Sequence, residues 1–438
     1  MSARDHFLGK RIAVVGLGPH GETVSDAAYL IKAGALVSVY ELKSEPRVKS
    51  HIAFLRSTGL ANYVCGAVPP DDLIDMDLII LSHEYPRDSS FLKQALAKGI
   101  PVEYPETLFF KVAPPVTVIG VMGAAGKATV VSMLAPMLEE ASKPHGQGLF
   151  VIDHESFDGC LAHLEQMKSG DIVLARLSSA TMRELHGMGV SPHVAVFTTV
   201  PIKGSYDQSP FEILERQTHN NYIVASDRVI DAIRDHAVKP KAKMFRTKAS
   251  FIPNSWELNG KGVHDRENAA LAVQTAELFK VSDAAAREAL KRWRPLKGRL
   301  EPVKKVKGVE FYNDTASASA YSTETAIQAL SQNRNIVLIF GGADLGHEYR
   351  ELYAVLPRFV HTVILLPGSG TMKERRTLEE LPDLEVYSVP SLEEATRLAL
   401  EHAKKGDRVV FSPGFDAGGM DQSRKERGER FVKAVRAL

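Results

Sequence analysis

The chain has 438 residues, a length that exceeds one ordinary hydrophobic core and predicts roughly two to four domains. Its hydrophobic content of 44% and charged content of 24% are typical of a globular protein. The formal net charge is +1, so overall charge gives no reason to expect a nucleic-acid or membrane surface. The two cysteines, Cys65 and Cys160, lie far apart and favour a reducing compartment over a disulfide-stapled exported fold.

The N-terminal segment has a short apolar run that stops at glycines after about six residues. Such a run is typical of a β-strand rather than of a signal peptide or a membrane span. We therefore expect a cytoplasmic protein without a membrane partner.

Short apolar runs alternate with amphipathic stretches along almost the whole chain, which is typical of βα units around parallel sheets. The predicted strands are 11–15, 36–41, 77–82, 100–102, 116–121, 171–174, 193–198, 221–225, 309–312, 336–340, 362–366 and 408–412. Helices are expected at 23–33, 268–279 and 283–293. Proline-containing segments at 113–115 and 294–302 suit linkers. The sequence therefore predicts three α/β domains, over residues 1–112, 113–298 and 299–438.

A glycine turn with the spacing G-x-G-x-x-G, from Gly16 to Gly21, ends the first predicted strand, and Glu41 ends the next one. In dinucleotide-binding Rossmann domains such a turn lies at the phosphates and an acidic residue meets a ribose. A Rossmann-type redox domain is therefore one interpretation of residues 1–112. The domains that follow make it a poor account of the whole protein.

A second glycine-bearing loop, which ends in Lys127, follows the predicted strand 116–121 and precedes a helix. Backbone N–H groups of such a loop and of the helix N-terminus converge on one point and bind phosphate oxygens. The lysine adds positive charge toward the β- and γ-phosphates of a nucleotide. The alternative is an ordinary βα turn with a solvated lysine.

Further motifs, in the same order and with nearly the same spacing, resemble those of the Mur ligase family, which makes amide bonds at the expense of ATP. The phosphate loop resembles the family's Gly-Thr-Asn-Gly-Lys-Thr/Ser-Thr, residues 262–268 its Gly-x-His-Asn-x-x-Asn, and residues 298–301 its His-Arg-Leu/Phe-Glu. Residues 312–315, 341–344, 412–414 and 426–431 resemble motifs of the D-glutamate-adding members. The resemblance covers the full length, and the motifs are specific only when they are taken together.

The resemblance implies a Rossmann-like N-terminal domain that binds a UDP-sugar, a P-loop ATPase-like central domain that binds ATP, and a Rossmann-like C-terminal domain that brings the amino acid. The implied UDP-sugar contacts are Gly16, Leu17, Gly18, Pro19, His20, Glu41 and Ser82. The implied ATP contacts are Gly123, Ala124, Ala125, Gly126, Lys127, Ala128, Thr129, Asn268, Arg299 and Asp314, with Lys127 also catalytic. The implied amino-acid contacts are Ser317 and Ser412.

The implied reaction joins D-glutamate to UDP-N-acetylmuramoyl-L-alanine. The free carboxylate of this UDP-sugar peptide precursor attacks the γ-phosphate of ATP to give an acyl phosphate, and the amine of D-glutamate then displaces phosphate. The implied cofactors are ATP and Mg²⁺. The implied partners are these small molecules, with no nucleic acid, for a monomer that acts in peptidoglycan synthesis alone or beside other wall-synthesis proteins.

The sequence departs from the family where Mg²⁺ is expected to bind. Ala128 replaces the Thr or Ser that follows the loop lysine, and Thr129 is rotated from that position by about 100° around a helix. Arg176 replaces a metal-binding glutamate, and arginine cannot bind Mg²⁺. Its guanidinium could take the place of the cation and pair with phosphate, which makes Arg176 a second catalytic candidate. The family's carbamylated lysine falls at Gln217, and residues 204–238 contain no lysine.

Positions that would contact the substrates differ as well. Ala316 replaces a lysine of the third domain, and Leu345 replaces the basic residue expected to hold the side chain of D-glutamate. Ala417 and Gly418 replace a Ser-Phe pair near the C-terminus. In the first domain, Glu84 brings a negative charge near an expected phosphate of the UDP-sugar, which disfavours its binding.

Three hypotheses account for this mixture of retained and replaced residues. The first is a working D-glutamate-adding ligase with a rebuilt metal site; its replacement ligands are Asp153, His154, Glu155 and Asp207, unless these are solvated loop residues. The second is a catalytically silent homologue that binds nucleotide and acts as a partner or regulator. The third is a ligase for a different acid and amine, which would explain the changed substrate positions but not the replaced metal ligands.

Overall fold

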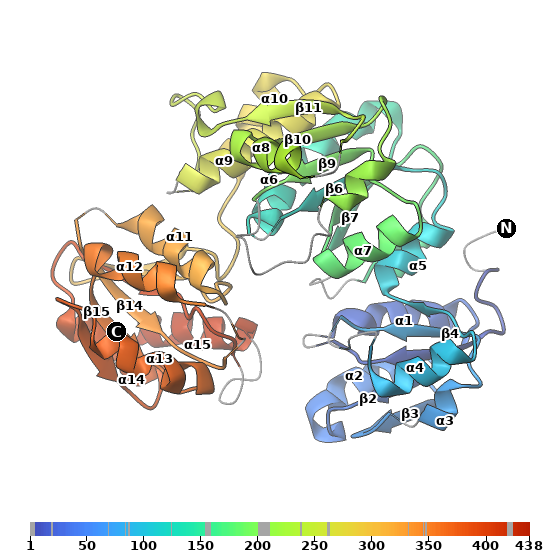
Figure 1. Ribbon diagram of the computed structural model, residues 1–438, viewed down its shortest axis with the longest axis horizontal. Helices are drawn as coiled ribbons and strands as arrows, with labels where there is room; N and C mark the ends of the chain where they lie inside the picture. The colour runs from blue at the N-terminus through green and yellow to red at the C-terminus, as the bar shows by residue number, and fades with distance from the viewer. Residues whose placement is uncertain are drawn as a thin grey trace. The chain divides into compact units, whose positions relative to one another are not determined.

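The computed structural model describes residues 5–438 apart from 19–20, 69, 84, 86–87, 124, 154–158, 200–210, 237–238, 261–262, 332, 345, 347 and 418–423. Three separate β-sheets with helices packed on them form this part of the chain (Figure 1). They confirm the predicted α/β fold with three domains, while the exact boundaries near residues 112 and 298 stay predictions. Internal packing divides the chain into two compact units, Met1–Thr247 with Leu271–Ala286, and Lys248–Ala270 with Arg287–Leu438. Among the described helices, none has the length and apolar content to span a membrane.

The first sheet has five parallel strands in the order β3-β2-β1-β4-β5. Its strands are β1 (Arg11–Val15), β2 (Leu36–Glu41), β3 (Asn62–Cys65), β4 (Leu78–Leu81) and β5 (Val102–Glu103). Its helices are α1 (Glu22–Lys32), α2 (Glu45–Ser57), α3 (Pro70–Leu73), α4 (Ser90–Ala97) and α5 (Pro105–Val112). The chain changes direction across the sheet between β1 and β4, so the turn after β1 lies at the switch point where open α/β sheets bind ligands.

The second sheet has six parallel strands in the order β11-β10-β9-β6-β8-β7. Its strands are β6 (Thr117–Met122), β7 (Leu149–Asp153), β8 (Ile172–Arg176), β9 (Val194–Phe197), β10 (Tyr222–Ser226) and β11 (Lys243–Thr247). Its helices are α6 (Lys127–Ser142), α7 (Ser179–Gly187) and α8 (Asp227–Asp235), with the 3₁₀ turns η1 (Lys143–His145), η2 (Leu161–Glu165) and η3 (Glu212–Arg216). The loop after β6 therefore lies between the carboxyl ends of β8 and β9.

The third sheet has the order β12-β13-β17-β14-β15-β16, in which only the β12–β13 pairing is antiparallel. Its strands are β12 (Glu301–Val306), β13 (Val309–Asn313), β14 (Ile336–Phe340), β15 (Val360–Leu365), β16 (Glu385–Ser388) and β17 (Arg408–Phe411). Its helices are α11 (Ala320–Leu330), α12 (Arg350–Phe359), α13 (Ser369–Glu379), α14 (Leu392–His402) and α15 (Arg424–Ala437). The turn η4 (Ala249–Phe251) and the helices α9 (Val263–Glu277) and α10 (Asp283–Arg292) precede this sheet in the chain. The loops after β13, β17 and β14 share one edge of it.

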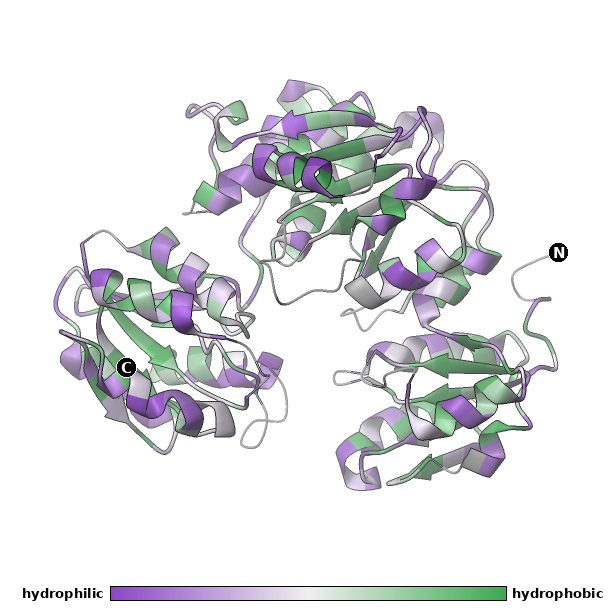
Figure 2. Cartoon of the chain, in the orientation of Figure 1, coloured by the Kyte–Doolittle hydropathy of each residue, from purple (hydrophilic) through white to green (hydrophobic). Residues whose placement is uncertain are grey.

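The central strands β4, β9 and β14 are apolar throughout, as expected for parallel sheets whose faces are covered by helices. All residues of Ile336–Phe340 are buried, and so are those of Val194–Phe197. Hydrophobic colour accordingly concentrates on the strands, while the helices carry the hydrophilic colour (Figure 2). Burial of these apolar strands is the main source of stability of the three sheets and their helices.

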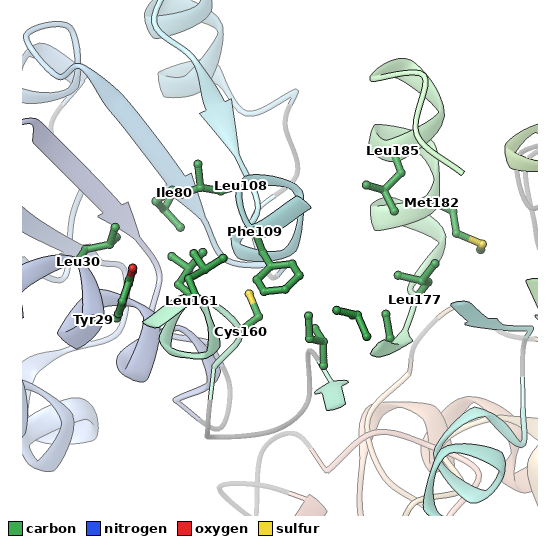
Figure 3. Packing of buried hydrophobic residues seen from close by; sticks show 14 of the residues in the cluster. Tyr29, Leu30, Ile80, Leu108, Phe109, Cys160, Leu161, Leu177, Met182 and Leu185 are labelled. Atoms are coloured by element: carbon green, nitrogen blue, oxygen red, sulfur yellow. The ribbon is translucent and has the colours of Figure 1, made fainter. Parts of the chain in front are cut away.

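One apolar core joins the first and second sheets within the first compact unit. Leu30 of α1, Phe109 of α5, Leu161 of η2 and Leu185 of α7 belong to it (Figure 3). Helix α5 contacts both η2 and α7. The core therefore packs the N-terminal sheet against the segments that follow β7 and β8.

A buried carboxylate lies within this core. Asp26 of α1 is 2% exposed, and its Oδ1 accepts the backbone N–H groups of Cys160 and Leu161, each at 2.8 Å. It thereby caps the start of η2 from a helix of the first domain. Burial raises the pKa of Asp26 to about 7, the two backbone donors oppose this rise, and the charge of Glu106 adds to it.

The raised pKa of Asp26 predicts that the fold weakens as the pH rises from about 4 to about 7. Between the ordinary pKa of 3.8 and about 7, the folded protein keeps a proton on Asp26 that the unfolded chain has released. The free energy of unfolding should therefore fall as pH rises through this interval. Asp26→Asn should flatten the decline, because the neutral amide still accepts the two N–H groups but does not titrate. Urea unfolding of the full chain at a series of pH values measures this.

Asp235→Asn is the matched control, because Asp235 lies exposed at the end of α8. It should leave the pH dependence as it is in the wild type. An Asp26→Asn protein with the wild-type decline would show that Asp26 does not titrate in this range.

Candidate functional site

The loop that was predicted to bind phosphate joins the end of β6 to the start of α6. Gly123 and Gly126 both have positive φ, 124° and 85°, and Gly126 is the N-cap of the helix. The ammonium Nζ of Lys127 donates to the carbonyl oxygen of Gly123 at 2.6 Å, which closes the loop on itself. The strand, loop and helix N-terminus thus have the arrangement in which backbone N–H groups collect a phosphate.

Two threonines that follow β9 fix this loop, and neither was predicted. The Thr198 hydroxyl lies 3.0 Å from the carbonyl oxygen of Met122 and also within hydrogen-bonding distance of that of Ala125. Thr199 Oγ1 accepts the backbone N–H of Ala125 at 3.2 Å. A Cβ at Gly123 would overlap the Thr198 hydroxyl and lie 2.8 Å from Thr199 N. The close approach of the β9 loop therefore requires glycine at position 123.

The two residues after Lys127 belong to helix α6. Thr129 is buried on α6, and its carbonyl oxygen accepts the Ser132 hydroxyl at 2.8 Å. Ala128 precedes it and offers only a methyl group. Ala124 lies outside the described residues, so its predicted contact with ATP stays a prediction, as do those of Ala125, Ala128 and Thr129.

Arg176 stands at the carboxyl end of β8, beside the strand that leads into the phosphate loop. It is paired in register with Val121 of β6 on one side and with Asp153 of β7 on the other. Its Nη1 donates to both carboxylate oxygens of Asp153, at 3.0 and 3.1 Å. The Arg176 side chain is 7% exposed, and that of Asp153 is 23% exposed. A guanidinium and its counter-ion therefore lie at the carboxyl ends of β8 and β7, next to the strand that leads into the phosphate loop.

The replacement metal ligands considered above meet a chemical obstacle. Asp153 is held by Arg176, while His154, Glu155 and Asp207 lie outside the described residues. In the part of the chain that the structure describes, no three His, Cys, Asp or Glu side chains gather in a way that could hold a metal ion. Ala128 and Arg176 offer a methyl and a cation where Mg²⁺ needs oxygen ligands. The described residues beside the loop do not fit Mg²⁺.

Gln217 does not lie where the sequence argument placed it. Its side-chain Nε2 donates to the carbonyl oxygen of Pro192 at 3.0 Å and to that of Tyr222 at 3.5 Å. Pro192 precedes β9 and Tyr222 opens β10, so Gln217 lies at the amino-terminal edge of the sheet, whereas the phosphate loop lies at the carboxyl edge. The assignment of Gln217 to the place of the carbamylated lysine is therefore wrong.

The predicted contacts of the first domain surround the turn between β1 and α1. Gly16 and Gly18 have positive φ, 82° and 83°, and Pro19 and His20 lie outside the described residues. The Glu41 carboxylate is fully buried. It accepts the backbone N–H of Leu17 and that of Lys43, each at 2.9 Å, and the hydroxyl of Tyr85 at 3.1 Å. Glu41 therefore holds the turn from within, and its predicted contact with a UDP-sugar stays a prediction.

Tyr85 covers the turn and was not recognised in the sequence. A Cβ at Gly16 would overlap the Tyr85 ring and lie 3.0 Å from the Ser82 hydroxyl. Ser82 is 2% exposed, and its backbone N–H donates to the Val15 carbonyl at 2.9 Å. The Lys43 ammonium donates to the Gly18 carbonyl at 3.3 Å and so places a positive charge at this turn. Ser82 thus lies next to the turn, as its predicted role requires, and that role stays a prediction.

In the third sheet, the structure brings together three of the predicted residues at the ends of β13 and β17. Ser412 Oγ donates to Asp314 Oδ2 at 2.8 Å, and the backbone N–H of Ser317 donates to the Asp314 carbonyl at 3.0 Å. Asp314 Oδ1 also accepts the N–H of Leu300 at 3.0 Å, which ties the segment around Arg299 to this edge. The Asp314 carboxylate thus holds together the segment before β12 and the segment after β17.

The pKa of Asp314 reflects its burial. Burial raises the pKa to about 6, and hydrogen bonds from Ser317, Ser412 and Leu300, together with the positive charge of Arg299, oppose the rise. Arg299 is half-buried, and Asn268 is buried on α9. The contacts predicted for Arg299, Asn268, Asp314, Ser317 and Ser412 with substrates stay predictions.

Comparison with known proteins places this arrangement in a class. Residues 298–415 match the family model described as Mur ligase, glutamate ligase domain. The chain is 27% identical, over 466 aligned residues, to the UDP-N-acetylmuramoylalanine--D-glutamate ligases of Streptococcus pyogenes serotypes M49 and M28, with 100% of this chain and 99% of each relative covered. The predicted resemblance to the Mur ligase family is thereby confirmed. Within that family, these relatives in sequence are D-glutamate ligases.

Solved structures confirm the three-domain fold. UDP-N-acetylmuramate-alanine ligase from Thermotoga maritima has a TM-score of 0.63 at 17% identity, covering 98% of this chain and 99% of that one. A murein peptide ligase from Psychrobacter arcticus has a TM-score of 0.60 at 15% identity, with the same coverage. The MurF ligase of Thermotoga maritima, solved with ADP, has a TM-score of 0.57 at 18% identity, covering 84% of this chain and 91% of that one.

Gly123→Ala should abolish phosphate binding by the loop. The new methyl group would collide with Thr198 and Thr199, and the positive φ adds strain of about 1–3 kcal/mol. Binding of a fluorescent ATP analogue and the unfolding midpoint measure the two effects.

Gly170→Ala is the control, because Gly170 also has a positive φ, 91°, but a Cβ there meets nothing within 4 Å. It should show the strain without the loss of binding. A Gly123→Ala protein that binds nucleotide as the wild type does would refute the role given to this loop.

Proposed function

We propose that the protein is an ATP-dependent amide-bond ligase of peptidoglycan precursor synthesis, which adds D-glutamate to UDP-N-acetylmuramoyl-L-alanine. The observation that carries the proposal is the loop of Gly123 to Lys127, closed and braced as a phosphate-binding loop. It lies in a chain that aligns from end to end with D-glutamate ligases. Fold similarity alone would not support an activity, so the loop is the essential part of the argument.

The proposed chemistry proceeds in two displacements. The carboxylate of the UDP-sugar peptide attacks the γ-phosphorus of ATP, ADP leaves, and an acyl phosphate forms. The amine of D-glutamate then attacks the acyl carbon, phosphate leaves with the bonding electrons, and the amide loses a proton to solvent. Lys127 and the backbone N–H groups of the loop bind the phosphates and stabilise the charge that moves to the leaving ADP.

The remaining predicted residues have roles in this proposal. Gly16, Leu17, Gly18 and Ser82 lie around the turn that would receive the UDP-sugar, where the Lys43 ammonium supplies positive charge. In the second compact unit, Asn268 would contact the adenine and Arg299 the phosphates. Asp314 would be a further contact to ATP, and Ser317 and Ser412 at the same edge would receive the amino acid.

A second candidate function has a specific observation in its favour. The ion pair of Arg176 with Asp153 occupies the sheet edge beside the phosphate loop, where oxygen ligands for Mg²⁺ are expected in a working ligase of this family. A protein with this edge would bind nucleotide without turning it over and would act as a partner or regulator in wall synthesis. The two candidates share the nucleotide site and differ in whether phosphate is released.

Phosphate release tests the first candidate directly. Release should require ATP, UDP-N-acetylmuramoyl-L-alanine and D-glutamate together, because each displacement needs its own nucleophile. Lys127→Ala should lower the rate by at least about a hundredfold, since a cation at the transferred phosphate is lost. A coupled phosphate assay with the full-length protein measures both effects.

Lys143→Ala, which removes an exposed lysine just after α6, is the control and should keep the wild-type rate. Binding of ATP without phosphate release under every substrate combination would reject the ligase and support the second candidate.

A further inference from the structure

A nucleotide bound at the phosphate loop needs positive charge, because its phosphates repel one another and any approaching anion. The described loop supplies the Lys127 ammonium and the N-terminus of α6, whose dipole favours anions. The adjacent strand β8 ends in Arg176, a group that is always charged. Positive charge is thus built into two adjacent elements of the protein itself.

The order of the strands decides which member of the Arg176–Asp153 pair lies nearer to the phosphate loop. In the sheet order β6-β8-β7, the arginine belongs to the strand next to the phosphate loop, and the aspartate belongs to the strand beyond it. Helix α6, which begins at Lys127, contacts both β7 and β8. The positive member of the pair is therefore on the strand adjoining the loop, in register with Val121, while Asp153 binds its guanidinium from the other side.

The same pairing works against a metal ion. A divalent cation beside β8 would be repelled by the guanidinium and would have to take Asp153 away from it. Ala128, the residue after the loop lysine, has no oxygen in its side chain to offer in exchange. The residues at the carboxyl ends of β8 and β7 therefore favour a nucleotide that carries no metal ion over a nucleotide–metal complex.

We propose that the phosphate loop binds nucleotide without a divalent cation, with the guanidinium of Arg176, held by Asp153, in the cation's place. This rests on the proposed function only in so far as the loop of Lys127 is a nucleotide site. The guanidinium in the cation's place means that the protein binds free ATP rather than the magnesium complex of ATP.

The test is calorimetric titration of the full-length protein with ATP and with ADP, in excess EDTA and in excess MgCl₂. The dissociation constant for ATP in EDTA should be within about threefold of the value in magnesium, or smaller. Binding in MgCl₂ only would overturn the inference and leave the proposed nucleotide site intact. No binding in either solution would overturn both, so the two failures are distinguishable.

Variants of the pair identify the residues responsible. Arg176→Gln should weaken binding in EDTA by about ten- to a hundredfold, the effect of one lost charge-assisted contact, whereas Arg176→Lys should keep most of it. Arg176→Glu should remove binding in EDTA and recover part of it in MgCl₂, because two carboxylates would then adjoin the loop. Wild-type affinity of Arg176→Gln in EDTA would overturn the role of the guanidinium.

Asp153→Asn separates a counter-ion from a metal ligand. As the counter-ion of Arg176, Asp153 lowers the local positive potential, so its neutralisation should leave binding in EDTA unchanged or tighten it by up to about tenfold. Weaker binding of Asp153→Asn in MgCl₂ alone would identify a metal ligand and overturn the proposal.

Arg228→Gln, at an exposed arginine of α8, is the matched control for loss of a positive charge and should bind ATP as the wild type does. Thermal unfolding of each variant shows whether it is folded. Where Arg176→Gln fails to fold, Arg176→Lys and Asp153→Asn decide the result.

Discussion

The ion pair of Arg176 with Asp153 is the constraint on which the chemistry of this protein depends. The register of β8 against β7 places the two residues side by side, in the sheet that also carries the phosphate loop. A buried or half-buried pair resists the loss of either partner, because the group left behind would be an uncompensated charge. A metal ion that needs Asp153 must therefore compete with an internal cation that is already in place.

The fold and the site have separate origins in this chain. Three parallel or mostly parallel sheets place a glycine turn, a phosphate loop and the Asp314 cluster at the carboxyl ends of their strands, where such sheets bind ligands. That placement follows from topology and survives many changes of side chain. The charges at these edges depend on single residues, and Arg176 is the one charged residue of the otherwise apolar strand β8. Similarity of fold therefore supports a binding edge, and only local chemistry supports a reaction.

The central strands could be predicted from the sequence and most edge strands could not. The strands without a prediction are β3, β7, β11, β12 and β16, and each forms an edge of its sheet. Central strands are buried on both faces and are continuous apolar runs, whereas an edge strand such as Lys243–Thr247 mixes charged, exposed and buried residues. The glycine loops were predictable because their spacing is local. The braces from Thr198, Thr199 and Tyr85 depend on partners far along the chain, and no local signal in the sequence indicated them.

Three of the buried carboxylates in this protein accept backbone N–H groups, a role that motif spacing does not reveal. Glu41 accepts one backbone N–H from the turn after β1 and one from Lys43. Asp26 accepts two at the start of η2, and Asp314 accepts one from the segment before β12. A carboxylate used in this way stabilises a backbone conformation, and its lone pairs are committed to that task before any ligand arrives. Glu41 and Asp314, which were predicted to contact substrates, thus also hold the backbone around them. What remains for an anionic substrate is cationic and backbone chemistry, centred on Lys127 and the N-terminus of α6.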